Sequence, residues 1–414
     1  MQGAGHPRRD LARRLLFEPS AMSLSPSVRI DRLQRRAAQE PDIIALGGGL
    51  PNPNFFPKRD LGDAFFRALH RPNEALQYGW PEGEPELRNW IALRLRALGA
   101  PVGPEDIVVT SGAQQAISLL ASTLFRPGMS VGMNEESYPG AIEAFRRAGL
   151  ALVPWQERAA GYYVMPSIGN PGGQPMAPSA RDELLSRLLE EKSLLIEDEA
   201  YAESCFDGRR ERPLLADLPA SVVHIGTLSK VLCPGLRVGW IATKHPALQR
   251  ILAEKQQADL QASSLTQRIV AEYVAGPRFD HHLERIRRGY ERKAKVMRAA
   301  VLAALPGFRV QRPRGGFSLW LEHVDPEPYI DDLTLLGAAV RHGVSFDPGR
   351  SFRIRESKRL AFRLCYGAVE EALIERGVAR LAEALSEVRP QQHHRRFSGV
   401  SLAGENGRSK NESM

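Results

Sequence analysis

Short apolar runs alternate with helical patterns through the middle of the chain. Segments with helical periodicity, such as AQQAISLLASTLF and PGAIEAFRRAGL, stand between candidate strands. Seven such strand candidates lie between residues 106 and 243: DIVVTSG, SVGMNEESY, ALVPW, GYYVMPS, KSLLIEDEAY, SVVHIGTLSK and RVGWIAT. Strands that alternate with helices are typical of an α/β protein with a mostly parallel sheet.

The pattern changes after this region. A long basic helical pattern at about 264–305 predicts a helix that carries the chain away from the sheet. The segment GFRVQRPRGGFSLWLEHV then returns to strand-like alternation, and a smaller α+β unit follows to about residue 388. We therefore expect a large domain over 60–295 and a small C-terminal domain over 296–388.

Composition is compatible with this division. The chain has 414 residues, of which 43% are hydrophobic, enough for one large core or two packed domains. No apolar run approaches the length of a membrane-spanning helix. The cysteines, Cys205, Cys233 and Cys365, follow no paired spacing, which predicts a reducing, cytoplasmic location.

The two ends of the chain differ from the middle. Residues 1–22 are arginine-rich but lack the apolar core of a secretory signal, so we expect a flexible extension, with Met22 as an alternative start. Residues 389–414 contain almost no apolar side chains and are expected to be disordered. Much of the net charge of +8 sits at these ends, where it favours solvation. We expect no nucleic-acid partner, no membrane partner and no metal site.

Polar residues close several of the apolar runs. In open α/β sheets, ligands bind at the carboxyl ends of the strands, so these residues are the first candidates for a site. Asn170, Asp198 and Lys230 each have an ordinary alternative, as a turn former, a helix cap and a solvated loop residue. All three alternatives would have to hold at once for the site to be absent.

Taken in order, these residues resemble a known family. Asn-Pro-x-Gly at 170–173, Asp-x-x-Tyr at 198–201, TLSK at 227–230 and PGLRVGW around Arg237 resemble the fold-type I pyridoxal-phosphate-dependent aminotransferases. The stretches LGGGLPNPNFFP, QYGWPEGEPELRNWI, TSGAQQAI and KQQADL resemble the α-aminoadipate and kynurenine aminotransferase branch. The similarity runs from about residue 24 to 388.

The resemblance implies a fold and a cofactor. The expected fold is a large domain with a mixed, mostly parallel seven-stranded sheet and a smaller α+β domain. An N-terminal arm, residues 23–59, is expected to contribute to the small domain and to the active site. The cofactor that the resemblance implies is pyridoxal 5′-phosphate, an electron sink that works best when its pyridine nitrogen stays protonated.

The resemblance also assigns roles around the cofactor. Lys230 is expected to form the resting Schiff base and then to carry the proton at the substrate Cα, and Asp198 to keep the ring nitrogen protonated. Asn170 and Tyr201 are expected to hydrogen-bond the 3′ oxygen, and Tyr138 to stack on the ring. The expected phosphate ligands are Gly112, Ala113, Gln114, Thr227, Ser229, Arg237 and, from the neighbouring subunit of a homodimer, Tyr78.

Substrate residues follow in the same way. Arg363 matches the position that binds the α-carboxylate, although Arg353, Arg355 and Arg359 lie nearby and remain alternatives. Asn170 is expected to share in this binding, and Gly49 to leave room for the substrate. Arg29 matches a position expected to bind a side-chain carboxylate, but a solvated helix face is an equally good interpretation of its charged surroundings.

Two features depart from the family. Ala113 stands where a serine is usual, so one phosphate hydrogen bond, worth about 1 kcal/mol, should be missing. In addition, only QERAAG separates the strand candidate ending at Trp155 from YYVMPS, where the family usually inserts a helix. A connection this short favours an antiparallel, hairpin-like path or a rebuilt sheet edge.

The expected activity is transfer of an amino group from an α-amino acid to a 2-oxo acid, 2-oxoglutarate first among them, by a ping-pong route through the pyridoxamine form. A second hypothesis keeps the cofactor but changes the outcome to decarboxylation, elimination or cyclisation. A third is a transcription regulator with an aminotransferase-like domain. Only about 40 residues precede PDIIALGGGLP, too few for a winged helix-turn-helix, which disfavours this third hypothesis.

Overall fold

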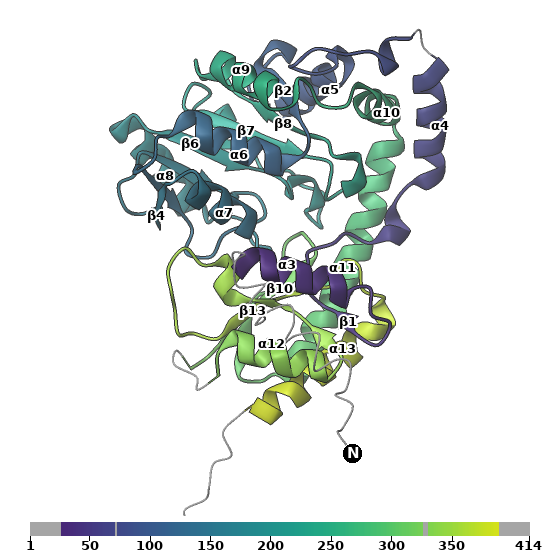
Figure 1. Cartoon of the computed structure of the whole chain (residues 1–414), viewed down its shortest axis with the longest axis vertical. Coiled ribbons are helices and arrows are strands. Elements are labelled where there is room, and N and C mark those ends of the chain that lie inside the picture. The colour runs from purple at the N-terminus through teal and green to yellow at the C-terminus, as the bar shows by residue number, and fades with distance from the viewer. Residues whose placement is uncertain (1–25, 71–72, 326–329, 389–414) are drawn as a thin grey trace, which may run out of the picture.

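The computed structural model describes residues 26–70, 73–325 and 330–388. The predictions for 1–22 and 389–414 lie outside these residues. The described chain is built around a large sheet and a small sheet, which occupy the upper and lower parts of Figure 1. None of the described helices combines the length and the apolar character needed to cross a bilayer.

The large sheet has seven strands and confirms the predicted set. They are β2 (Ile107–Thr110), β3 (Ser130–Met133), β4 (Ala151–Pro154), β5 (Gly161–Val164), β6 (Leu194–Asp198), β7 (Val222–Thr227) and β8 (Gly239–Ala242). Their order is β2-β8-β7-β6-β5-β3-β4. Only β8 runs antiparallel to its neighbours β2 and β7, so the sheet is mostly parallel as predicted.

Helices surround this sheet (Figure 1). They are α4 (Lys58–His70), α5 (Pro85–Arg96), α6 (Ala113–Leu124), α7 (Pro139–Arg147), α8 (Pro178–Glu191), α9 (Leu248–Asp259) and α10 (Ser264–Val274). Among them, α4 packs on α10 and not on the sheet itself. The central strands have few polar positions because both faces are covered; every residue of β7 is buried.

The predicted long helix at 264–305 is two helices. α10 ends at Val274, and α11 (Arg278–Ala304) begins after the Gly276-Pro277 pair. Proline lacks a backbone N–H, so it is accommodated at a helix start and interrupts a continuous helix. α11 then runs from the large-sheet part to the small-sheet part (Figure 1), and the predicted domain boundary at 295/296 falls inside it.

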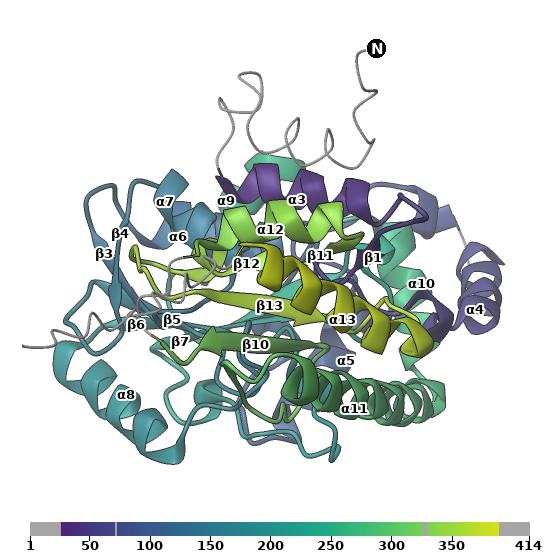
Figure 2. The same cartoon turned by 90° about the horizontal axis from the view of Figure 1, so that it is seen from below.

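The small sheet is antiparallel. Its order is β12 (Asp347–Pro348), β13 (Ala361–Cys365), β10 (Ser318–His323) and β9 (Phe308–Val310). Helix α13 (Glu371–Val388) packs against both α11 and α12 (Asp332–Arg341), as Figure 2 shows. In the predicted arm, α3 (Pro26–Ala37) precedes β1 (Ile44–Ala45), which pairs in parallel with β11 (Val344–Ser345).

The short connection after β4 takes a path that the sequence did not predict. β4 and β5 lie on opposite sides of β3 and both run parallel to it, so the hairpin-like interpretation was wrong. Residues 155–160 cross β3 without a helix, and a Cβ built on Gly132 would lie 3.2 Å from the Cα of Trp155. The missing side chain at Gly132 lets the chain cross here. The sheet edge is therefore a parallel strand, β4.

Candidate active site

A cavity of about 730 Å³ lies where the large sheet meets the small one. It includes the carboxyl end of the large sheet, the usual place for a ligand in an open α/β fold. The predicted site residues that line it are Gly49, Gln114, Tyr138, Asn170, Tyr201, Lys230 and Arg363. Helix α3 contributes Val28, Ile30, Asp31 and Gln34 to the wall.

Lys230 follows β7 and points into an aromatic corner of the cavity. Its Nζ lies 5.5 Å from the ring centroid of Tyr201 and 5.8 Å from that of Phe317. Burial, together with the positive charge of Arg363, lowers the pKa of Lys230 to about 8. About a tenth of this amine is therefore neutral at pH 7, far more than for a solvated lysine.

Asp198 ends β6 and is only 2% exposed. Its Oδ2 accepts a hydrogen bond of 2.6 Å from the hydroxyl of Tyr163, and its Oδ1 accepts one of 3.0 Å from the N–H of Ala200. Burial raises the pKa of Asp198, and these two hydrogen bonds oppose the rise. The carboxylate is a buried acceptor held in a fixed orientation.

Tyr163 is a residue that the sequence analysis missed. It lies on β5, which pairs with β6, and its side chain is fully buried. In the sequence, Tyr163 is only a hydroxyl in an otherwise apolar strand. That β5 lies beside β6, the strand that ends in Asp198, becomes known only from the strand order, because α8 separates the two strands in sequence.

Asn170 and Arg363 come together from the two parts of the molecule. Asn170 precedes a cis peptide bond to Pro171, and its Oδ1 accepts a hydrogen bond of 2.8 Å from Nη1 of Arg363 on β13. The Arg363 guanidinium also lies 4.7 Å from the ring centroid of Phe352. Arg363 is 8% exposed, so this is a buried cation facing the cavity.

The alternative arginines bind carboxylates elsewhere. Arg353 pairs with Glu136, Arg355 with Glu157 and Arg359 with Glu322. None of the three lines the cavity. Of the four candidates, the structure brings only Arg363 to the site.

The predicted phosphate ligands gather at the start of α6. Gly112 has a φ of +89°, and a Cβ there would lie 2.5 Å from Nη2 of Arg237, so the two residues are closely packed. Nη2 of Arg237 also donates to the carbonyl oxygen of Ser111 at 2.9 Å. The N–H of Ser229 donates to Oγ1 of Thr227 at 3.1 Å, which fixes the adjoining turn. A helix start, hydroxyls and a guanidinium together suit a phosphate dianion, so the residues present fit pyridoxal phosphate.

A partly buried chain of polar contacts supports this loop. Oε1 of Gln115 accepts from the N–H of Ser111 at 2.7 Å, and Nε2 of Gln115 donates to Asp259 at 2.6 Å. Lys255, fully buried, pairs with Asp259 at 2.9 Å. Lys255 and Asp259 belong to KQQADL, a stretch to which the sequence analysis gave no role.

Tyr138 and Gln114 form one side of the cavity. The hydroxyl of Tyr138 donates to Oε1 of Gln114 at 3.1 Å, and Nε2 of Gln114 donates to the carbonyl oxygen of Gly140 at 2.9 Å. Burial raises the pKa of Tyr138 to about 12, so its hydroxyl stays protonated and remains a donor. The ring is thereby fixed at the cavity wall.

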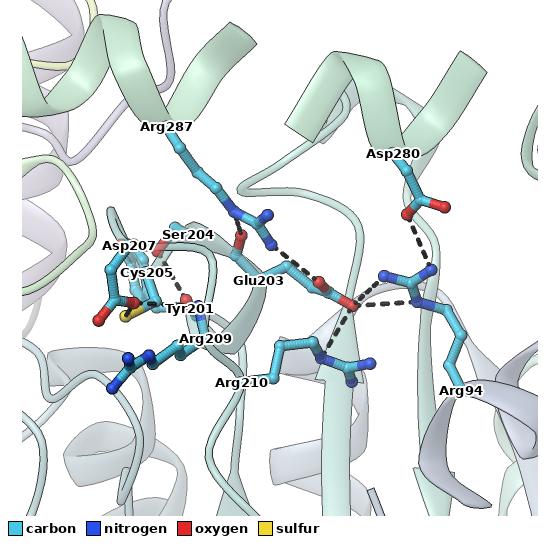
Figure 3. A network of polar contacts seen from close by, with 10 residues as sticks. All are labelled: Arg94, Tyr201, Glu203, Ser204, Cys205, Asp207, Arg209, Arg210, Asp280 and Arg287. Atoms are coloured by element: carbon cyan, nitrogen blue, oxygen red, sulfur yellow. Dashed lines mark hydrogen bonds and ion pairs between the residues drawn. The ribbon is translucent and has the colours of Figure 1, made fainter. Parts of the chain in front are cut away.

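An arginine cluster holds the loop that carries Tyr201. Glu203, two residues after Tyr201, pairs with Arg94 at 2.9 Å, with Arg210 at 3.3 Å and with Arg287 at 3.4 Å, as Figure 3 shows. Arg94 comes from α5 and Arg287 from α11. The loop is therefore attached to two helices that are distant in sequence and are themselves joined by the Arg94–Asp280 ion pair.

Eight of the predicted site residues are not among those that line the cavity: Gly112, Ala113, Asp198, Thr227, Ser229, Arg237, Arg29 and Tyr78. The last two also lie outside the groups described above. Arg29 on α3 is not among the lining residues, although its neighbours Val28 and Ile30 are. Tyr78 is 77% exposed, and Trp80 beside it is 68% exposed. A single chain thus leaves the roles of Arg29 and Tyr78 untested.

The chain is similar to known proteins over most of its length. The family model described as "Aminotransferase class I and II" matches residues 57–381. The 2-aminoadipate transaminase of Thermus thermophilus is 34% identical over 378 residues, which cover 84% of this chain and 92% of that protein. A structure of the α-aminoadipate aminotransferase LysN from Thermus thermophilus, in complex with N-(5′-phosphopyridoxyl)-L-leucine, has a TM-score of 0.78 and 31% identity and covers 89% of this chain and 99% of that one.

A regulator is also among the similar proteins. The uncharacterized HTH-type transcriptional regulator YdfD of Bacillus subtilis is 27% identical over 386 residues, covering 88% of this chain and 78% of that protein. The match therefore leaves part of the regulator's own length uncovered.

Proposed function

Because the chain belongs to the family of class I and class II aminotransferases, we propose that the cavity around Lys230 is its active site. The protein is a pyridoxal-phosphate-dependent aminotransferase that moves an amino group from an α-amino acid to a 2-oxo acid. The observation that carries the site assignment is the meeting of Lys230, Arg363 and Asn170 in one cavity, with Asp198 fixed at the end of the strand beside β7.

The cofactor supplies an electron sink for the negative charge that develops at the substrate Cα. Lys230, whose pKa of about 8 leaves part of its amine neutral, anchors the cofactor and then takes and returns the Cα proton. When the cofactor is bound, the buried carboxylate of Asp198 would hold the proton on its ring nitrogen by the attraction of opposite charges.

Arg363 and Asn170 orient the substrate. The guanidinium of Arg363 binds the α-carboxylate, since its planar array of N–H groups matches a carboxylate in geometry and charge. Gly49 has a φ of +59°, and a Cβ there would lie 2.9 Å from Nη2 of Arg363. A glycine at 49 keeps the guanidinium accessible to the substrate.

We propose 2-oxoglutarate as the amino acceptor. Similarity to a 2-aminoadipate transaminase supports a substrate with a second carboxylate. Arg29 lies on α3, whose neighbouring residues line the cavity, and is our candidate for the residue that binds this second carboxylate. A structural role in holding α3 is the alternative.

We propose that the enzyme is a homodimer and acts in the cytoplasm. Large apolar side chains are exposed along α4 and the segment that follows: Phe65 43%, Phe66 62%, Leu69 39%, Leu76 71%, Tyr78 77% and Trp80 68%. Exposed apolar side chains in such number mark an interaction surface. In a two-fold dimer built on this surface, Tyr78 of one subunit would reach the phosphate in the other.

The proposed cytoplasmic location rests on cysteine spacing that predicts no disulfide.

The test is a panel of α-amino acids, each incubated with 2-oxoglutarate and the purified holoenzyme. The proposal predicts that glutamate forms in equal amount to the 2-oxo acid derived from the donor. Release of carbon dioxide or ammonia without glutamate would favour decarboxylation or elimination and would overturn the proposal.

A further inference from the structure

The buried carboxylate of Asp347 lies against the guanidinium of Arg363. Asp347 on β12 stands directly opposite Arg363 on β13 in the antiparallel register. Its Oδ2 accepts from Nε of Arg363 at 3.0 Å and from Nη2 at 2.7 Å. Asp347 is 5% exposed and also lines the cavity.

The hydrogen bonds of Arg363 determine which of its donors face a ligand. An arginine carries one N–H on Nε and two on each terminal nitrogen. Asp347 takes the Nε donor and one Nη2 donor, and Asn170 takes one Nη1 donor. Within the described residues this leaves one donor on Nη1 and one on Nη2, the pair that a carboxylate binds in a bidentate manner.

The same carboxylate also holds the glycine loop beside Arg363. The N–H of Gly48 lies 2.9 Å from Oδ1 of Asp347 and 3.0 Å from Oδ2. Gly49, the next residue, packs against Nη2 of Arg363. Asp347 therefore sets the position of the arginine and of the loop that limits access to it.

We propose that Asp347 is a positioning residue that presents the Nη1/Nη2 edge of Arg363 to the substrate α-carboxylate. The inference rests on the proposed role of Arg363. Without Asp347, the buried guanidinium would keep Asn170 and Phe352 as neighbours but lose the partner that fixes its Nε edge. It would then turn toward other acceptors, and carboxylate binding would weaken.

The test compares Asp347→Ala with the wild-type holoenzyme. KM for α-amino acids and for 2-oxoglutarate should rise about 10- to 100-fold, the range expected for hydrogen bonds to a charged group. The value of kcat at saturation should stay within about threefold, because the carboxylate is bound equally before and during the reaction. Asp347→Asn keeps the shape and one acceptor, and should recover part of the lost affinity.

A simple primary amine without a carboxylate separates this role from a general loss of structure. Such an amine never uses Arg363, so its half-reaction should run equally in wild type and Asp347→Ala. Asp106→Asn is the matched control, since Asp106 is buried, accepts from the N–H of Gly103 at 2.8 Å and pairs with Lys244, yet does not line the cavity. That control should leave every KM unchanged.

Two results would overturn the inference: an unchanged KM for α-amino acids in Asp347→Ala, or an equal loss with the primary amine. The binding of maleate, a dicarboxylate with no amino or oxo group, is measured in parallel from the absorbance of the bound cofactor. Its Kd should rise about tenfold or more in Asp347→Ala, by the same loss of charged hydrogen bonds. If no amino acid is transaminated but maleate still separates the variants, the proposed function fails while the role of Asp347 stands.

Discussion

The hydroxyl of Tyr163 donates a 2.6 Å hydrogen bond to Oδ2 of Asp198, and both side chains are buried. The bond stabilises the ionised carboxylate and so limits the rise that burial causes in the pKa of Asp198. The same carboxylate raises the pKa of Tyr163 further above its usual value, after burial, so Tyr163 remains a donor at any pH the enzyme meets. In the proposed site, Tyr163 would therefore act on the cofactor through Asp198.

Replacement of Tyr163 by phenylalanine should raise the pKa of Asp198 and weaken its hold on the ring proton. The single-turnover rate with a good amino donor should fall about tenfold, as for loss of a hydrogen bond to a charged group. A pH titration of cofactor absorbance should shift as well. Tyr162→Phe is the control, because Tyr162 donates to Glu191, away from the cavity. An equal effect of both substitutions would mean that Tyr163 only fills space.

Asp198→Ala should slow removal of the Cα proton much more than Tyr163→Phe does. Loss of one preorganised electrostatic contact in an active site commonly costs about 10²- to 10³-fold in rate, and this carboxylate is a dominant one. Circular dichroism and cofactor binding should stay close to wild type, because the phosphate ligands remain. If Asp198→Ala kept near-normal single-turnover rates, the role of Asp198 would be structural, as the acceptor of the hydrogen bond from the Ala200 N–H.

Lys230 should capture pyridoxal phosphate with a pH dependence set by its pKa of about 8. Only the neutral amine attacks an aldehyde, so the rate of capture by the apoenzyme should rise about fivefold to tenfold from pH 7 to 9 and then level off. Stopped-flow absorbance measures this rate. A rise that continues beyond pH 10 would show an ordinary, solvated lysine.

Lys230→Ala is the companion variant. It should still bind the cofactor through the residues at the start of α6, but borohydride should no longer fix the cofactor to the protein, and transamination should cease. A Lys230→Ala protein that transaminates at the wild-type rate would contradict the site assignment.

Arg29→Gln tests the dicarboxylate interpretation. If Arg29 binds the second carboxylate, KM for glutamate and 2-aminoadipate should rise by an amount worth about 1.5–3 kcal/mol, while neutral and aromatic donors are barely affected. Arg32→Gln, an exposed change on the same helix, is the control. Equal losses for both classes of donor would assign Arg29 to holding the helix in place.

The proposed dimer depends on the exposed apolar side chains of α4. Phe66→Glu should give a monomer by analytical ultracentrifugation, whereas Leu189→Glu, at 61% exposure on α8 compared with 62% for Phe66, should leave the dimer intact. If neither substitution dissociates the dimer, the contact between the subunits lies elsewhere.

Subunit mixing tests the crossing of Tyr78. Tyr78→Ala and Lys230→Ala proteins are each expected to be impaired, but a mixed dimer contains one site with both wild-type residues. Activity should therefore return on mixing. If mixed dimers form and activity does not return, Tyr78 does not act in the active site of the neighbouring subunit.

Most of the large sheet could be predicted from the sequence because buried parallel strands form short, continuous apolar runs bounded by helical patterns. The long basic pattern at 264–305 was read as one helix because both of its halves are amphipathic, and the break depends on Gly276 and Pro277 alone. The path after β4 could not be predicted, since strand direction there depends on the position of β3 between its partners.

The site divides in the same way. Lys230, Asp198 and Arg363, which we propose to contact the cofactor or the substrate, lie at strand ends or in recognisable motifs, so the sequence predicts them. Tyr163 and Asp347 act through those residues, and only the pairing of strands brings them close. Local sequence patterns do not predict which distant strands pair.

Because the chain crosses over Gly132, residue 132 and the 155–160 connection are expected to evolve together. A side chain at 132 would collide with the ring of Tyr162 and approach the backbone of Trp155. With the Tyr162 ring and the short connection from 155 to 160 both on that face, glycine is strongly favoured at 132. A homologue that lengthens this connection into a helix removes the Trp155 backbone from that face, and the constraint then relaxes where residue 162 is also smaller than tyrosine. Loop length and residues 132 and 162 should therefore change together among homologues.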